Sequence, residues 1–243
     1  MIALRRSSRL SKIAFAAGVG LAVAGCAALG PELARSGFPL VGPDDATISA
    51  GLKEALQIGA ERSVSRAARP GGFLEDPRVR IPLPPELDKL ARGLRALGFN
   101  GAVDDLETAM NRAAERAARE AQEPLVDAVA SLTIADARAI LAGSDDAATR
   151  YLRSHGESAL RERFAPVVEK AMRGAGVYRA YDELRARNRA LALLADPTVE
   201  LNRHVTDETL DGLFTLIADE ERRIRSDPAA RTTELLRAVF GEP

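Results

Sequence analysis

Apolar residues recur three and four positions apart along most of the chain, a spacing that is typical of helices burying one face. The clearest stripe lies in residues 86–97, where leucines and alanines follow this period among charged residues. No pair of alternating segments carries a hairpin signal between them. The pattern predicts an all-α protein with a single multi-helix domain. Helices are expected over residues 47–68, 86–97, 102–122, 125–132, 157–173 and 177–194.

Particular residues indicate where these helices begin or break. Asp45 or Thr47 is placed to cap the first helix. Pro166 is expected to kink or break its helix, because a proline nitrogen carries no proton to donate. Residues 195–205 predict a looser connection, after which Thr206 caps the last strong helix.

Residues 73–85 depart from the helical pattern. Their four prolines exclude a helix and favour extended backbone. This predicts one proline-rich extended segment, the ribbon, which lies on the helices with one side buried. Its two arginines are candidates for a functional surface, and the alternative is that they pair with acidic residues of the helices beneath. The alternation places Val79, Ile81 and Leu83 on one side of the ribbon and Arg78, Arg80 and Pro82 on the other.

The first 26 residues have the order of an export signal: a basic start, then the apolar residues 13–24. That run is too short for a bilayer span, which needs roughly 20 residues. It ends in Val23-Ala24-Gly25-Cys26, which resembles a bacterial lipobox. The resemblance implies cleavage between Gly25 and Cys26 and lipidation of Cys26. The alternatives are an ordinary signal peptide, or an uncleaved anchor in which Cys26 stands by chance.

The expected organisation is therefore a lipoprotein signal peptide over residues 1–25, a flexible tether over 26–43 and a helical domain over 44–243. Glycine and proline are frequent in the tether, which predicts no regular structure there.

The net charge of the chain argues against nucleic acid as a general partner. The chain has 34 basic and 35 acidic residues, and removing the four basic residues of the signal leaves 30 against 35, a net charge of about −5. An acidic protein is a poor general binder of nucleic acid. Cys26 is the single cysteine, so no disulfide within the chain is available.

Several segments resemble a bacterial exported-protein family, domain of unknown function 4197. The longest is RPGGFLEDPRVRIPLP over residues 69–84. Others are Asn111-Arg-Ala-Ala-Glu115, Asp145-Asp-Ala-Ala-Thr149 and Leu210-Asp-Gly-Leu-Phe214. The resemblance implies a single helical exported domain and brings no activity with it.

Candidate binding residues are few. Asp145 and Asp146 can form an acidic site, although such a pair more often caps a helix. Arg231 can bind an anion at a helix start or pair with a nearby acid. We identify no catalytic residues. With Arg78 and Arg80 of the ribbon, these are all the candidate binding residues.

The two histidines do not form a recognisable metal motif. His155 and His204 follow Leu152 and Leu201, where a carboxylate-bridged metal site would need glutamate three residues earlier. Glu200 and His204 are four apart, and we interpret them as a surface pair. We therefore expect no metal and no cofactor.

These features lead to the hypothesis of a bacterial envelope lipoprotein, non-catalytic and exposed to the periplasm, that binds or scaffolds a partner. Its expected partners are the membrane, through Cys26, and an envelope protein, and not nucleic acid. Ala27 after the cysteine resembles the default for outer-membrane sorting in Gram-negative bacteria. The alternative is a small-ligand-binding protein or enzyme with a polar pocket around Arg80, Asp145, Asp146 and Arg231.

Overall fold

The computed structural model of the chain describes residues 42–96, 98, 100–186 and 198–241. This part of the chain is helical and contains no strand, which confirms the all-α class. The elements are α1 (Asp45–Ala67), α2 (Pro85–Ala96), α3 (Asn100–Ala118), α4 (Gln122–Ser131), α5 (Ala137–Leu141), α6 (Ala147–Ala175), α7 (Val177–Ala186), α9 (Thr198–Ser226), the 3-10 helix η1 (Pro228–Ala230) and α10 (Glu234–Phe240).

The predicted signal, Gly25, Cys26 and all of the tether before Gly42 lie outside the described residues. Within the described ranges, no helix is both long enough and apolar enough to cross a bilayer.

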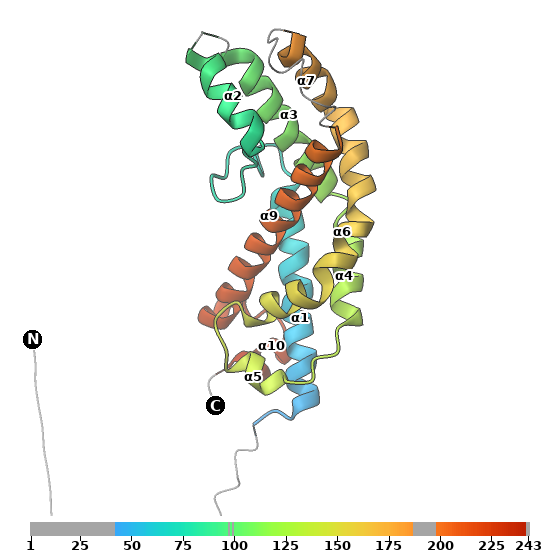
Figure 1. Cartoon of the computed structure of the whole chain (residues 1–243). Helices are drawn as coiled ribbons and strands as arrows, with labels where there is room; N and C mark the ends of the chain where they lie inside the picture. The colour runs from blue at the N-terminus through green and yellow to red at the C-terminus, as the bar shows by residue number, and fades with distance from the viewer. Residues whose placement is uncertain (1–41, 97, 99, 187–197, 242–243) are drawn as a thin grey trace, which may run out of the picture. The chain divides into compact units, whose positions relative to one another are not determined.

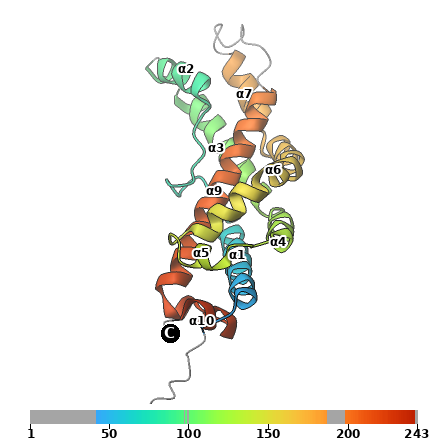
Figure 2. The ribbon, with the colours of Figure 1, turned by 60° about the horizontal axis from the view of Figure 1, so that its bottom comes forward.

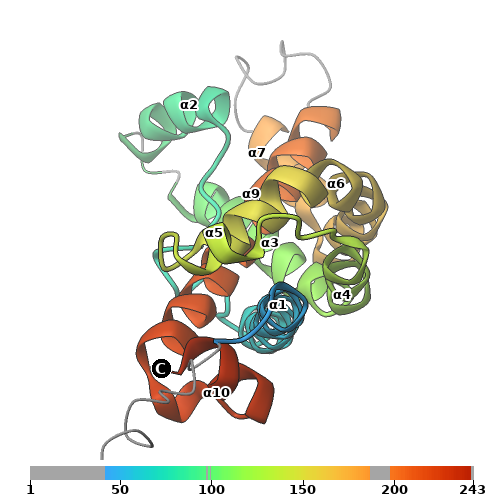
Figure 3. The same ribbon diagram turned by 90° about the horizontal axis from the view of Figure 1, so that it is seen from below.

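Four helices form the centre of the fold. α9 packs along α1 and against α6, and α3 packs against α6 (Figure 1). Seen from below, α1 is viewed almost along its axis and lies between α4 and α10 (Figure 3). The helices meet through buried apolar side chains such as Leu52, Met110, Phe164 and Ile217. α2 and α7 lie at the opposite end of α9 from α10 (Figure 2).

Two helix starts differ from the predictions. Asp44, not Asp45 or Thr47, caps α1, because its Oδ1 accepts the Thr47 N–H at 2.7 Å. α9 already begins at Thr198, so the predicted looser connection is wrong from that residue onward. Thr206 lies inside α9, where its hydroxyl donates to the Asn202 carbonyl at 2.7 Å. A threonine hydroxyl can bond the carbonyl four residues earlier inside a helix as well as cap a helix start, so the residue type alone does not distinguish the two positions.

Of the kink or break predicted at Pro166, the break is wrong, because α6 is one helix of 29 residues that runs through this proline. Pro166 and Glu162 are both exposed, so water can hydrate the Glu162 carbonyl that proline leaves without a donor. Phe164 and Val168 are buried on the opposite side of α6. This packing keeps the helix continuous despite the missing hydrogen bond.

Candidate functional site: the ribbon between two helices

The ribbon, residues 73–85, is built from turns followed by residues 80–84 without regular secondary structure, and its last residue, Pro85, already begins α2. Its first half turns at Asp76, whose carbonyl accepts the N–H of Arg80 at 2.9 Å. The predicted alternation is confirmed over residues 78–83, because Val79, Ile81 and Leu83 are buried while Arg78, Arg80 and Pro82 are exposed. Phe73 and Pro84 of the ribbon are buried as well.

A buried asparagine of α3 holds the middle of the ribbon. The Asn111 side-chain amide donates to the Ile81 carbonyl and accepts the Ile81 N–H, both at 2.9 Å. A neighbouring strand would make the same two contacts. The Asn111 amide also donates to the Glu107 carbonyl, and its side chain is fully buried. Asn111 therefore satisfies the buried backbone of a segment that has no partner strand.

One helical turn further along α3, a buried carboxylate holds the start of the ribbon. Glu115 Oε1 lies 3.4 Å from the backbone nitrogens of Phe73 and Leu74 and accepts from both. Its other oxygen accepts from Arg112 at 2.8 Å. Glu115 is only 4% exposed, so its charge is balanced by these donors rather than by bulk water.

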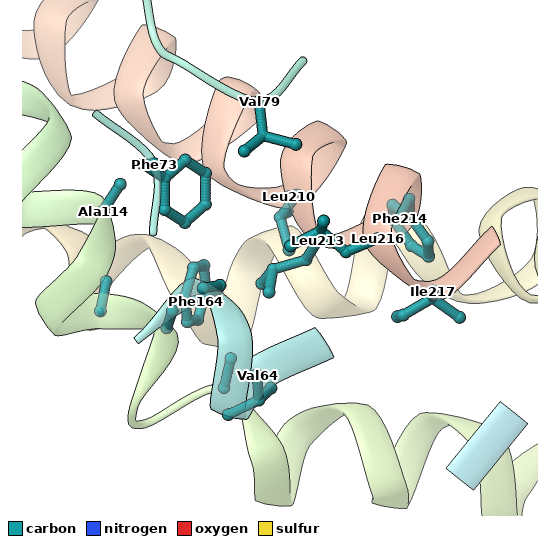
Figure 4. Close-up of a cluster of buried hydrophobic side chains, with 14 of the residues drawn as sticks. Val64, Phe73, Val79, Ala114, Phe164, Leu210, Leu213, Phe214, Leu216 and Ile217 are labelled. Atoms are coloured by element: carbon teal, nitrogen blue, oxygen red, sulfur yellow. The ribbon is translucent and has the colours of Figure 1, made fainter. Parts of the chain in front are cut away.

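On the opposite side the ribbon packs against α9. Phe73 lies between α3 and α9, close to Ala114 and Leu210 (Figure 4). Gly212 of α9 makes this approach feasible. A Cβ at Gly212 would lie 2.6 Å from Phe73 Cε1 and 3.3 Å from Val79 Cβ.

Replacing Gly212 with alanine is therefore expected to destabilise the protein by about 1–3 kcal/mol, because Phe73 must move out of a packed position. Alanine normally stabilises a helix interior relative to glycine, so destabilisation would isolate the packing effect. Chemical denaturation followed by circular dichroism measures it. Gly59→Ala in α1 is the matched control, since its new Cβ would meet Ile217 at an ordinary 3.5 Å. Equal stabilities for the two variants would contradict this account.

The two candidate arginines tie the ribbon to different helices. Arg78 forms a two-point ion pair with Asp76, at 3.1 and 2.8 Å, and reaches Asp219 of α9 at 2.5 Å. Arg80 pairs with Glu107 of α3 at 2.9 Å. The hydrogen bond from Arg78 lowers the pKa of the Asp76 carboxyl below its ordinary value, and the nearby Arg66 acts in the same direction. Both arginines therefore pair with acidic residues of the helices beneath the ribbon, which was the alternative prediction.

His204 supplies another contact between ribbon and helix. Its Nε2 lies 2.8 Å from the Pro82 carbonyl oxygen. A carbonyl only accepts, so the neutral ring carries its proton on Nε2. His204 therefore has a role in holding the ribbon.

The other candidate binding residues, Asp145, Asp146 and Arg231, are outside the ribbon and do not form one site. Asp146 pairs with Arg150 at 3.0 Å, and a hydrogen bond from Ser144 lowers the pKa of its carboxyl. Asp145 is exposed. Arg231 donates to the carbonyls of Ile224 and Arg225 at the end of α9. Within the described residues, no hydrogen bond or ion pair joins any two of Arg80, Asp145, Asp146 and Arg231.

The predicted cap of α6 is corrected. Asp146 occupies the N-cap position but makes no side-chain cap bond. Glu221 of α9 fulfils this role: its carboxylate accepts the N–H groups of Ala148 and Thr149, at 3.0 and 2.7 Å. A carboxylate at a helix N-terminus also meets the positive end of the helix dipole. Glu221 is 1% exposed and pairs with Arg225 at 2.9 Å.

The family described as "Protein of unknown function (DUF4197)" matches residues 42–241. The chain belongs to this family. Comparisons with curated proteins and with solved structures found no match.

In this DUF4197 domain, three of the four motifs that carried the resemblance are in contact with one another. The ribbon motif is held by Asn111 and Glu115, which are the two ends of the motif Asn111-Arg-Ala-Ala-Glu115. Gly212 belongs to a third motif, Leu210-Asp-Gly-Leu-Phe214, and contacts Phe73. The motifs contain Asn111, Glu115 and Gly212, but the contacts of these residues with the ribbon were not predicted. Their placement inside or beside the apolar stripes of α3 and α9 was the signal available.

The described part of the domain has no group of three or more His, Cys, Asp or Glu residues that can hold a metal ion. The contacts of the ribbon site hold an irregular segment rigidly between α3 and α9. Its carboxylates and guanidinium groups bond to one another or to backbone.

Proposed function

We propose that this protein is a bacterial envelope lipoprotein whose DUF4197 domain faces the periplasm and acts by binding or scaffolding, without catalysis. The observation that carries the proposal is Val23-Ala24-Gly25-Cys26, which places the single cysteine at the end of an export signal. The domain needs no thiol for its fold, so lipidation gives Cys26 a use. Each buried methylene of an acyl chain contributes about 0.8 kcal/mol, and two or three chains anchor stably.

The junction between tether and domain supports this topology. Arg138 of α5 donates to the Pro43 carbonyl at 3.2 Å and pairs with Asp45 at 2.5 Å, which holds the chain where it enters α1. Residues 27–43 precede that point. Fully extended, they reach about 60 Å, so the domain can meet an envelope partner well away from the lipid surface. The residue after Cys26 is alanine, which favours the outer membrane in a Gram-negative cell.

Changing Cys26 to serine is expected to move the protein from the membrane fraction to a soluble or unprocessed form. Mass spectrometry of the parent should show a chain that starts at residue 26 and carries acyl groups. Ala27→Ser, which keeps the cysteine, is the matched control and should stay in the membrane fraction.

Two results would contradict the anchor. If parent and Cys26→Ser are both soluble and cleaved, the signal is an ordinary one. If both stay in the membrane with residues 1–25 intact, the apolar run is an uncleaved anchor.

A further inference from the structure

A cavity of 360 Å³ lies between α4 and α6, on a side of the fold that the ribbon does not reach, and is called the α4–α6 cavity here. Figures 1 and 3 show the two helices side by side. The volume falls in the range of small-molecule sites. One wall is Asp127 and Ala128 of α4, and the other is Tyr151, His155 and Leu160 of α6.

His155 is fixed in orientation at this cavity. The Tyr151 hydroxyl donates to the Thr133 carbonyl at 2.5 Å, and the His155 ring stacks on the Tyr151 ring with centroids 4.0 Å apart. His155 Nδ1 lies 2.9 Å from the Tyr151 carbonyl oxygen. Since that oxygen only accepts, Nδ1 carries the proton of the neutral ring. Nε2 is then a hydrogen-bond acceptor with a free lone pair.

Among the described residues, none bonds to that lone pair. In the described part of the chain, both neighbours of the His155 ring, Ser154 and the Tyr151 carbonyl, bond to Nδ1 and none to Nε2. His204 shows the opposite arrangement, with Nε2 donating to the ribbon. The two histidines are therefore expected to be opposite neutral tautomers, one structural and one presenting an open acceptor at a cavity.

Asp127 offers the cavity a carboxylate for a cation, and Arg163 is the other charged residue that lines it besides His155. Asp127 pairs with Arg163 at 3.3 Å, and both side chains are more than half exposed, so this pair is weak and the carboxylate is available. Lys170 pairs with Glu120 at 3.7 Å beside a second cavity, which shares Asp127 and Arg163 with the first. That second cavity is lined by four carboxylates and two guanidinium groups, so the summed charge beside Asp127 stays negative even with Lys170 counted. Those groups belong to Glu61, Glu120, Glu123, Asp127, Arg119 and Arg163.

We propose that the α4–α6 cavity binds a primary ammonium ion that carries an apolar body. The ammonium donates one N–H to His155 Nε2 and another to the Asp127 carboxylate. The apolar body packs against Leu132, Leu160 and Ala128, which also line the cavity. A quaternary ammonium has the same charge but no N–H, and a carboxylate has the opposite charge, so neither satisfies the imidazole acceptor.

The two histidines provide a direct test, because the full chain labelled with ¹³C at histidine Cε1 gives two imidazole signals. The chain is titrated in nonionic detergent at neutral pH with phenethylammonium, with its N-trimethyl derivative and with 3-phenylpropionate. Phenethylammonium is expected to shift the His155 signal saturably and to leave the His204 signal in place. The other two probes should produce no saturable shift.

Variants then separate the two contacts, with ligand-observed NMR as the readout. His155→Phe keeps the stack on Tyr151 but loses the lone pair, and it should weaken phenethylammonium binding about fivefold or more. Asp127→Asn should weaken it by a similar factor. Asp88→Asn, the same change in an exposed pair with Arg92 on α2, should bind like the parent.

The proposal is wrong if phenethylammonium gives no saturable His155 shift, if the trimethyl derivative or the carboxylate binds equally well, or if both histidine signals move together. It is also wrong if both site variants bind like the parent. None of these results depends on Cys26, so the cavity and the lipid anchor stand or fall separately.

Discussion

Replacing Glu221 with alanine is expected to lower the free energy of unfolding by about 3–5 kcal/mol, because it leaves a nearly buried charge without its partner. Arg225 is 9% exposed at its side chain and Glu221 is 1% exposed. The same substitution removes the acceptor for the Ala148 and Thr149 N–H groups at the start of α6. An unpaired buried charge and an unsatisfied backbone N–H each lower the stability of a protein, and this substitution produces both.

The loss should spread beyond α6, because Arg225 also contacts α5 and α10. It donates to the carbonyls of Leu141 and Ile140 at the end of α5, at 2.7 and 3.1 Å. Its guanidinium also lies over the Phe240 ring of α10, 5.4 Å from the centroid. Without Glu221 to orient it, Arg225 is expected to hold α5 and α10 less firmly.

Urea denaturation followed by circular dichroism measures the effect. Glu220→Ala is the matched control at the neighbouring position, where the glutamate pairs at 3.2 Å with Arg62 on a partly exposed surface. That control should cost less than about 1 kcal/mol. If the two variants unfold at the same urea concentration, the buried carboxylate does not stabilise the fold as argued.

Glu221 also shows what sequence reasoning misses. The stretch before α6 contains Ser144, Asp145 and Asp146, all of which are good cap residues, and local pattern selects among them. The carboxylate that does the capping comes from 72 residues away along the chain. A partner supplied by tertiary structure leaves no mark in the local sequence. The helices themselves could be predicted, because apolar periodicity records which face each helix buries.

The ribbon contains both features that the sequence predicts and features that it does not. Alternating residues predicted correctly which side chains are buried, since that choice depends only on polarity and spacing. The contacts of Arg78 and Arg80 with α9 and α3 remained open, because either a free surface or an ion pair suits an exposed arginine. The polar groups that hold the ribbon, Asn111 and Glu115, lie on a helix whose alanine-rich sequence indicates only close packing.

Asn111→Ala is expected to destabilise the protein by about 2–5 kcal/mol and to loosen the ribbon specifically. The substitution leaves the N–H and the carbonyl of Ile81 without partners at a buried residue, and each unsatisfied group costs roughly 1–3 kcal/mol. Arg80→Ala is the control, because it removes a half-exposed ion pair next to the same segment and should cost less than about 1 kcal/mol.

Hydrogen exchange at the Ile81 amide distinguishes loss of this clamp from general destabilisation. In the parent that N–H is held by Asn111 Oδ1 at 2.9 Å and should exchange only through opening of the ribbon. In Asn111→Ala it should exchange faster than amides in the middle of α9, whereas Arg80→Ala should leave the order of protection unchanged. If the Ile81 amide stays as protected as the α9 amides, hydrophobic burial of Phe73, Val79 and Ile81 alone holds the ribbon. The polar clamp would then serve to set the register of the ribbon on α3 and contribute little to its stability.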